Sequence, residues 1–512
     1  QRINMKLNSY RFFLFSLISL FAGSISIFSQ APFNFLPVLS FSFPFLFLIL
    51  GAENFKDSFL KRSVRFVYFG SIFLYGYFFF GLSWIGSAFS YKLEFEGLKF
   101  LSIFGLPLLL VLLSSPGWLI TALFWGPRLQ SCFAIAFGVI VGEYSRSILL
   151  TGFPWILFGH SLSFDDRAMQ ISSIVGAHSA SLIVVLFSLT PILLINKKTI
   201  FPGLITASIL PLLIFYGSTR IPDSLNFSEK SFLLVQPNIS QDVKLSRDSF
   251  QLSMDKLINL SSKNQNADLI IWPESALPVL LSQDDQIRKH IMESIGGGSS
   301  LLTGNIRIDE NGDYKNSSFL IHENGKIISS YDKVHLVPFG EYLPFSGIIK
   351  KFNFLKVISS DNGFSKGLSF EPISTPIGLA RILICYEIIF SKEISWSDSR
   401  PEVLINITND AWFDKFSGPY QHFENARFRA IEYGLPVLRS ANTGISAVIG
   451  PYGRVLSKIK LGEEGAIYSL LPQRITNTFF SKFGDFTLLI LIILCCICFR
   501  KNLMREYFND KK

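Results

Sequence analysis

The chain has 512 residues, of which 49% are hydrophobic, and a mean hydropathy of +0.38. It is too long for one ordinary domain and too apolar for a soluble protein. The net charge of +9 does not indicate nucleic-acid binding, because Lys and Arg gather in short loops beside apolar segments, as in membrane proteins. Only one of the five cysteines, Cys385, lies in the polar part of the chain, which excludes a disulfide framework or a zinc site there.

The first 217 residues contain seven apolar stretches of membrane-spanning length. We predict spans near residues 10–28, 33–51, 66–88, 100–125, 131–150, 169–195 and 199–217, and an eighth over 484–499. If every span crosses, the basic N-terminus, the basic loops and the basic C-terminal tail share one side, which is then cytoplasmic. The predicted organisation is a membrane domain (1–218), a polar domain on the opposite side (219–480), and a last transmembrane helix with its tail (481–512).

Two parts of the predicted membrane domain carry unusual residues. Glu143 and Arg146 lie three apart near the fifth span, where an unpaired charge in lipid costs about 2.5–3.5 kcal/mol. We expect them to pair or to face the interior of the helix bundle, as a functional pair or as an interfacial ion pair. The stretch from Gly152 to His160 is aromatic and broken by proline, and its Trp155 is either an interface anchor or part of a lipid-entry wall.

The polar region alternates short apolar runs with helical stretches, which is typical of an α/β layered domain. Strands are predicted over 232–236, 267–272, 301–305, 319–321, 327–331, 382–386 and 403–408, and helices near 247–261 and 282–295. Asn324-Gly325 predicts a hairpin turn, and the segment 450–453 predicts another turn. The pattern favours a sheet that turns back on itself.

Three of these strand ends carry residue types that suit acid–base and nucleophilic chemistry. Glu274 follows the apolar run 269–272, and Cys385 comes at the end of the run 380–384. Lys333 lies two residues after the end of the predicted strand 327–331. A strand end followed by a loop is where open α/β layers hold reactive groups. Each residue alone also has a structural interpretation: a carboxylate at a helix start, a solvated lysine and a buried thiol.

The Glu–Lys–Cys set resembles that of the nitrilase (carbon–nitrogen hydrolase) superfamily, and its surroundings are similar to the membrane-bound apolipoprotein N-acyltransferase branch. The resemblance covers nearly the whole chain. The strings that carry it are Val337-Pro-Phe-Gly-Glu341-Tyr342, Cys385-Tyr386-Glu387, Asn409-Asp-Ala-Trp412-Phe413, Gly418-Pro-Tyr-Gln-His422, Ala426-Arg-Phe-Arg-Ala430, Arg439 and Asn442-Thr-Gly444. It implies a multi-pass α-helical membrane domain of eight spans plus an α/β nitrilase-like αββα sandwich.

The resemblance also implies roles for single residues. Glu274 would be the general base, Lys333 would stabilise the oxyanion, and Cys385 would be the nucleophile. The residues implied as supporting groups are Glu341, Tyr386, Glu387 and Trp412. The resemblance implies no metal and no cofactor.

The implied reaction is a two-step acyl transfer. An acyl chain would pass from a membrane phospholipid to the cysteine as a thioester, and then to the N-terminal α-amine of the diacylglyceryl-cysteine of an apolipoprotein. The implied partners are therefore the phospholipid donor, the apolipoprotein acceptor and the lipid bilayer, without nucleic acid, and we expect a monomer. The implied location is the bacterial inner membrane, with the catalytic domain on the periplasmic side.

The stretch 343–355 follows Glu341 directly and combines apolar and aromatic residues with paired lysines. We interpret it as a lid at the membrane interface, with an ordinary packed loop as the alternative. The residues that we expect to contact lipid are Trp155, Phe345, Phe352 and Phe354.

Three positions depart from the family pattern. Pro237 and Asp414 stand where glycine is usual, and Leu245 stands where tryptophan is usual. These departures leave open a paralogue with another acyl donor or acceptor. Two further alternatives are a membrane-tethered amidase or nitrilase that hydrolyses its acyl-enzyme with water, and a non-catalytic transporter or scaffold.

Overall fold

The computed structural model describes residues 2–52, 58–90, 96–244, 249–263, 266–342, 344, 363–394, 396–397, 399–486, 490 and 493. The chain divides into two compact units. The helical unit comprises Gln1–Ser83, Phe100–Ile221 and Thr478–Lys512, and the sandwich unit comprises Trp84–Lys99 and Pro222–Asn477.

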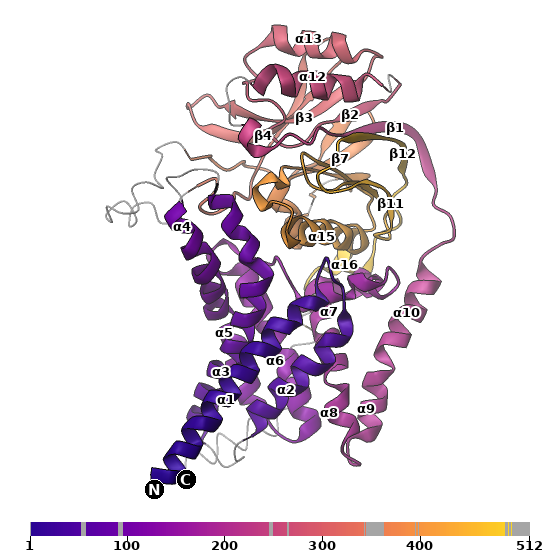
Figure 1. Ribbon diagram of the computed structural model, residues 1–512. Helices are drawn as coiled ribbons and strands as arrows, with labels where there is room; N and C mark the ends of the chain where they lie inside the picture. Colours follow the sequence, from indigo (N-terminus) through magenta and orange to yellow (C-terminus); the bar gives the residue numbers. More distant parts are fainter. Residues whose placement is uncertain are drawn as a thin grey trace. The chain divides into compact units, whose positions relative to one another are not determined.

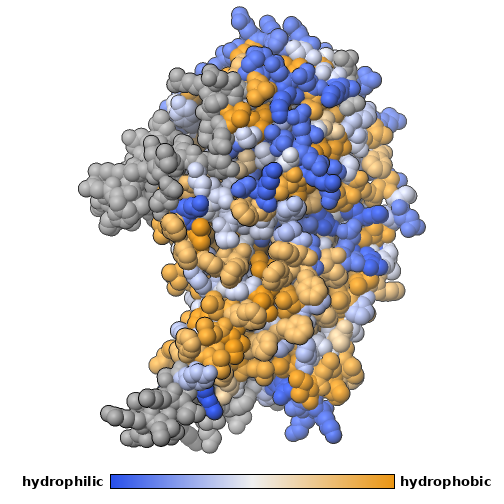
Figure 2. Space-filling model, in the orientation of Figure 1, coloured by the Kyte–Doolittle hydropathy of each residue, from blue (hydrophilic) through white to orange (hydrophobic). Residues whose placement is uncertain are grey.

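The helical unit consists of helices (Figure 1), and long stretches of its sequence are apolar. Its helices are α1 (Arg2–Ser26), α2 (Leu39–Gly51), α3 (Phe59–Leu82), α5 (Leu106–Leu123), α6 (Arg128–Ile148), α7 (Ser172–Ser188), α8 (Thr190–Leu194), α9 (Ile200–Ala207), α10 (Ile209–Arg220) and α16 (Phe479–Phe483), while α4 (Glu96–Phe100) falls across the division between the units. Figure 2 shows hydrophobic side chains gathered over these helices. Large apolar residues such as Phe21, Phe201 and Phe215 are exposed on them, as in a protein whose helices face lipid.

Six helical stretches in the described part of the chain are long and apolar enough to cross a membrane. They are Tyr10–Ser29, Phe59–Phe89, Leu98–Leu123, Arg128–Thr151, Ala168–Leu194 and Ile200–Arg220, and each matches a predicted span. The predicted second span, 33–51, is shorter in the structure: a 3₁₀ turn that contains Pro37 precedes α2, and the apolar helix covers only Leu36–Gly51. Most of the predicted eighth span, 484–499, lies outside the described residues, so the total of eight stays a prediction.

Close contacts between small residues hold helices α5 and α6 together. A Cβ atom added to Gly117 would lie 2.0 Å from the carbonyl oxygen of Gly138, so the two backbones could not approach as they do with larger residues.

Glu143 and Arg146 of α6 are both buried, with Oε1 and Nη2 4.0 Å apart, so the expected inward-facing pair is present. Arg146 donates to the carbonyl oxygens of Phe153 and Ile156, and the backbone N–H of Phe158 donates to Glu143 at 2.7 Å. The pair therefore fixes the backbone of the proline-broken stretch that follows α6.

The sandwich unit is built on two six-stranded sheets. The first has the order β12-β1-β2-β3-β4-β5 and the second has the order β11-β10-β9-β8-β7-β6. The strands are β1 (Phe227–Gln236), β2 (Leu269–Ile271), β3 (Ser300–Ile308), β4 (Tyr314–Ile321), β5 (Ile327–Asp332), β6 (Ile373–Thr375), β7 (Gly378–Ile384), β8 (Val403–Thr408), β9 (Val437–Ala441), β10 (Ser446–Ile449), β11 (Val455–Ile459) and β12 (Gly465–Pro472). Strands β1 to β3 are parallel, and so are β7 to β9, so their carboxyl ends meet at one edge of each sheet.

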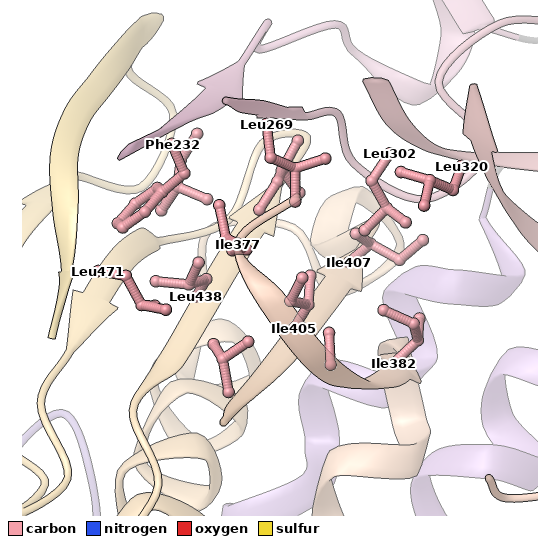
Figure 3. Packing of buried hydrophobic residues seen from close by; sticks show 14 of the residues in the cluster. Phe232, Leu269, Leu302, Leu320, Ile377, Ile382, Ile405, Ile407, Leu438 and Leu471 are labelled. Atoms are coloured by element: carbon pink, nitrogen blue, oxygen red, sulfur yellow. The ribbon is translucent and has the colours of Figure 1, made fainter. Parts of the chain in front are cut away.

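Alternation of side chains along the strands produces the layers. In β1, Phe232 points into the core between the sheets (Figure 3), and Leu234 belongs to the same core. Leu233 and Val235 instead face helices α12 (Ser249–Ser261) and α13 (Asp285–Ile295). Helix α15 (Ser417–Tyr433) packs against β9 of the second sheet. The result is the predicted αββα sandwich (Figure 1).

Every predicted strand is present, as are both predicted helices and both predicted turns. The strand predicted over 382–386 ends at Ile384, however, and Cys385 and Tyr386 belong to the 3₁₀ turn that follows. Gly325 occupies the hairpin between β4 and β5 with a φ of 81°, and the Gly453 N–H donates to the Gly450 carbonyl between β10 and β11. Among the described strands and α-helices of the sandwich unit, those that the sequence did not predict are β6, β9 to β12, α11 (Gln241–Lys244) and α15.

Candidate active site

Glu274 follows β2, and its close approach to the next strand depends on a glycine. A Cβ atom added to Gly304 of β3 would lie 2.6 Å from the Glu274 Cα and 2.8 Å from the Ser275 nitrogen. Ser275 itself has a φ of 46°, which turns the chain sharply after the carboxylate. The turn and the glycine together place a buried carboxylate at the carboxyl end of the sheet.

Two neighbours hold the Glu274 side chain through separate oxygens. Asn316 Nδ2 on β4 donates to Oε1 at 2.9 Å, and the backbone N–H of Asn409 donates to Oε2 at 2.9 Å. Because Asn409 follows β8 of the second sheet, the carboxylate links the strand ends of both sheets.

Lys333 comes directly after β5 and is only 1% exposed. Its Nζ lies 2.9 Å from Glu341 Oε1 and 3.7 Å from Glu274 Oε1. Asn316 Nδ2 also donates to Glu341 at 2.8 Å, and the Val337 N–H donates to its other oxygen at 2.7 Å. One ammonium therefore stands between the buried carboxylate of Glu274 and the half-buried carboxylate of Glu341, and one amide bridges the same two carboxylates.

Cys385 stands at the sharp turn after β7. Its φ of 53° lies in the left-handed region, which costs a non-glycine residue roughly 1–3 kcal/mol and persists only where its surroundings hold it. The turn is a short 3₁₀ helix, Cys385–Ile389, in which Glu387 Oε2 accepts the backbone N–H of Ile384 at 2.8 Å.

Glu387 connects the cysteine turn to the lysine segment. Its Oε1 accepts from the Tyr331 hydroxyl at 2.8 Å and from the backbone N–H groups of Val334 and His335 at 2.8 and 3.2 Å. These residues flank Lys333, so one buried carboxylate fixes the distance between the lysine segment and the cysteine turn.

The charges of the site act on the thiol and on the ammonium. Burial raises the pKa of Cys385, the Glu274 carboxylate raises it further, and Lys333 opposes both. Burial alone would lower the pKa of Lys333, but Glu341 and Glu274 more than offset this and raise it. The resting site thus pairs a neutral thiol with a permanent cation, and the thiol needs a base at the moment of reaction.

The structure therefore brings Glu274, Lys333 and Cys385 together with Glu341 and Glu387. Tyr386 is buried beside Phe390, with ring centroids 4.9 Å apart. Trp412 is half-buried in the 3₁₀ turn Asp410–Phe413, just after the backbone N–H that binds Glu274.

The residues predicted to contact lipid are less well defined. Trp155 is buried in the helical unit and stacks on Phe153 with centroids 5.9 Å apart, and a lipid contact for it stays a prediction. Phe345, Phe352 and Phe354 lie outside the described residues, as does most of the predicted lid.

Sequence reasoning missed Asn316, the residue that binds both glutamates. It is an ordinary strand residue in the sequence, and only the pairing of β3 with β4 brings it beside the site. Among the described residues, no three His, Cys, Asp or Glu side chains form a group that could hold a metal ion.

Comparisons with known proteins agree with this architecture. Residues 22–190 match the family model "Apolipoprotein N-acyltransferase N-terminal domain", and residues 234–478 match the model "Carbon-nitrogen hydrolase". The chain is 34% identical over 518 residues to the apolipoprotein N-acyltransferase of Rhodopseudomonas palustris, with 95% of each chain covered. It is 36% identical over 481 residues to that of Agrobacterium fabrum, with 91% of each covered. The chain belongs to the apolipoprotein N-acyltransferase family.

A similarity to a solved structure covers about half of the chain. A carbon-nitrogen hydrolase from Helicobacter pylori is 18% identical, with a TM-score of 0.37, over 47% of this chain and 88% of that one.

Two of the departures from the family pattern lie in described regions. Asp414 has a φ of 53° and a ψ of −156°, a region of backbone space that essentially only glycine adopts. Glycine is usual there for this reason, and the aspartate is strained. Pro237 directly follows β1, and Leu245 lies outside the described residues.

Proposed function

We propose that this chain is an apolipoprotein N-acyltransferase that transfers an acyl chain from a membrane phospholipid to the N-terminal α-amine of lipid-modified apolipoproteins. The observation that carries the proposal is the cluster of a buried carboxylate, a buried ammonium and a thiol at the strand ends of a sandwich, in a chain that matches this family along its length. Acyltransferase chemistry needs a nucleophile, a base and an oxyanion stabiliser, and the cluster supplies all three.

In the first step the thiol of Cys385 attacks the ester carbonyl of the phospholipid. The thiol proton passes to the Glu274 carboxylate as the S–C bond forms, and the carbonyl oxygen becomes an oxyanion that Lys333 stabilises. Collapse of this intermediate breaks the C–O bond, and the Glu274 carboxylic acid returns its proton to the leaving alkoxide. The products are a Cys385 thioester and a lysophospholipid.

In the second step the α-amine of the apolipoprotein attacks the thioester carbonyl. Glu274 accepts a proton from the amine, a new oxyanion forms beside Lys333, and the C–S bond breaks as the thiolate regains a proton. The products are an amide at the apolipoprotein N-terminus and the free Cys385 thiol. The two substrates thus react in turn through one acyl-enzyme.

The proposed location is the bacterial inner membrane, with the sandwich unit on the periplasmic side. The support is the placement of Lys and Arg in the loops that share one side with the basic N-terminus. The donor and acceptor are both anchored in lipid, which matches a multi-span enzyme, and we propose a monomer.

The test is mass spectrometry of the purified full chain after incubation with vesicles of phospholipid that carries labelled acyl chains. We expect a labelled acyl adduct on Cys385 that Cys385→Ala abolishes and that Cys132→Ala, the matched change of a buried cysteine in the helical unit, retains. Addition of a diacylglyceryl-cysteine peptide should move the label to its free α-amine, and an N-acetylated peptide should accept none. Release of the label as free fatty acid in the presence of the free-amine peptide would identify a hydrolase instead.

A further inference from the structure

Three buried polar residues behind the nucleophile have no part in the mechanism above. Asp410, His422 and Arg439 come from the turn after β8, from α15 and from β9, and none of their side chains is exposed. All three lie in strings through which the sequence resembles its family, yet the mechanism above assigns none of them as a base, a nucleophile or an oxyanion donor. Hydrogen bonds connect these side chains to the backbone of Cys385.

The carbonyl oxygen of Cys385 faces two side-chain donors. His422 Nε2 lies 3.1 Å from this oxygen, and Asn406 Nδ2 on β8 lies 3.4 Å from it. A carbonyl oxygen only accepts, so His422 carries a proton on Nε2 in this arrangement.

Arg439 orients both donors at once. Its Nη1 donates to Asn406 Oδ1, which turns the amide nitrogen toward the carbonyls of Leu383, at 2.9 Å, and Cys385. Its Nη2 lies 3.1 Å from His422 Nδ1 and donates to Asp410 Oδ2 at 2.7 Å. Asp410 Oδ1 lies 2.9 Å from the same imidazole nitrogen and also accepts from the Thr408 hydroxyl.

We propose that His422 is a positioning residue for the nucleophile: its Nε2–H, oriented by the Asp410–Arg439 pair, fixes the Cys385 carbonyl and so holds the cysteine turn in its left-handed conformation. The inference rests on the proposed function, because it assigns the network to the same nucleophile. A non-glycine residue keeps a positive φ only where neighbouring groups over-determine it, and the two donors on this carbonyl supply that constraint.

The charges in the network agree with this assignment. Asp410 and Arg439 already balance each other, so a third charge would stand unpaired in a fully buried site. Burial and the nearby Arg439 charge lower the pKa of His422, and the Asp410 carboxylate opposes them. Nε2 keeps its proton for the Cys385 carbonyl, whereas Nδ1 faces both the Arg439 guanidinium and the Asp410 carboxylate.

Loss of the hydrogen bond from His422 to the Cys385 carbonyl should slow the chemical step. When the carbonyl is released, the turn can relax and shift the sulfur relative to Glu274 and Lys333, and a displacement of about 1 Å is enough to slow an enzyme about 100-fold. Binding of the phospholipid acyl chain does not involve this carbonyl, so the concentration of donor that gives half the maximal rate should change little.

The experiment compares His422→Gln with His422→Met in the full chain. The two side chains have nearly the same size and shape, but only glutamine places an N–H donor where Nε2 stands. Three quantities are measured for each variant: the thermal unfolding midpoint, the rate of the Cys385 acyl adduct at saturating phospholipid, and the rate at which iodoacetamide alkylates Cys385.

We expect His422→Met to slow both reactions of Cys385 at least about tenfold, and His422→Gln to stay within about threefold of the wild type. A folded His422→Met variant with wild-type rates, or equal slowing by both substitutions, would overturn the proposal. If His422→Met does not fold, His422→Asn replaces it: its amide is too short to reach the carbonyl, and wild-type rates would again refute the assignment. If wild-type protein is alkylated but forms no acyl adduct, the proposed function fails, and the ratio of the two alkylation rates still tests the inference.

Discussion

Gly304→Ala tests whether the backbone contact between β3 and the turn after β2 sets the position of the Glu274 carboxylate. The new methyl group would lie 2.6 Å from the Glu274 Cα, 2.8 Å from the Ser275 nitrogen and 3.0 Å from the Pro273 carbonyl oxygen. All three are backbone atoms, so no flexible side chain can move aside to make room.

The expected magnitude follows from this overlap. Non-bonded carbon atoms prefer about 3.5–4.0 Å, so the turn that carries Glu274 must retreat by about 1 Å. Overpacking of this kind lowers the free energy of unfolding by about 1–3 kcal/mol, which a domain of this size survives. A displacement of about 1 Å at the base slows the chemistry about 100-fold. We therefore expect a folded protein with a large loss of activity.

The assay is the rate of acyl-adduct formation on Cys385 per mole of folded protein, with the unfolding midpoint measured in parallel. Gly465→Ala of β12 is the matched control, because its added Cβ would meet only Ile459 side-chain atoms at 3.5 Å or more, an ordinary contact. A Gly304→Ala variant that forms the adduct as fast as the control would show that the position of Glu274 does not depend on this contact.

Three further predictions concern stability. Burial would raise the pKa of Asp410, but Arg439 and His422 lower it to about 2, so the folded carboxyl is more acidic than the unfolded one. Its contribution to the free energy of unfolding is complete above about pH 4 and is lost as the pH falls toward about 2. Unfolding midpoints measured against pH should show this decline, and Asp410→Asn should flatten it. Glu387→Gln should lower the free energy of unfolding by about 1–3 kcal/mol, because an amide nitrogen in place of Oε2 cannot accept from the Ile384 N–H. Denaturant unfolding measures this loss, and an unchanged midpoint would contradict the prediction. Asp414→Gly should raise the unfolding midpoint because it relieves a backbone strain of about 1–3 kcal/mol, and an unchanged or lower midpoint would refute the strain.

The sequence predicts the first half of the sandwich better than the second. Strands β1 to β5 are short apolar runs between clear turn signals, and these runs stand out beside polar helices. Helix α15 has no such signal, because nearly all of its residues, including Glu424, Arg427 and Arg429, are buried. A helix that is enclosed on every side loses the polar stripe by which an amphipathic helix is recognised.

In the membrane part, the sequence predicts the helices but not the contacts of the segment that follows α3. Composition alone finds the spans, and six helices of the described chain match it. Composition does not show that Trp84, directly after α3, belongs to the sandwich unit, where its Nε1 donates to Gln421 at 3.1 Å and its ring meets Phe413. That contact joins positions more than 300 residues apart, and periodicity within a short window carries no information about it.

The charge changes during the proposed reaction explain why Lys333 has two carboxylate neighbours. The proposed reaction starts with Glu274 and Glu341 as carboxylates, Lys333 as an ammonium and Cys385 as a thiol. As the thiol proton moves to Glu274, that carboxylate becomes neutral and an oxyanion appears, so one negative charge moves while the total stays constant. Lys333 would lose an anchor at this moment if Glu274 were its only partner. Glu341, 2.9 Å from Nζ and held by Val337 and Asn316, keeps the ammonium in place while the charge moves. An ammonium that does not have to reorient stabilises the oxyanion without reorganisation, which is the main source of electrostatic catalysis.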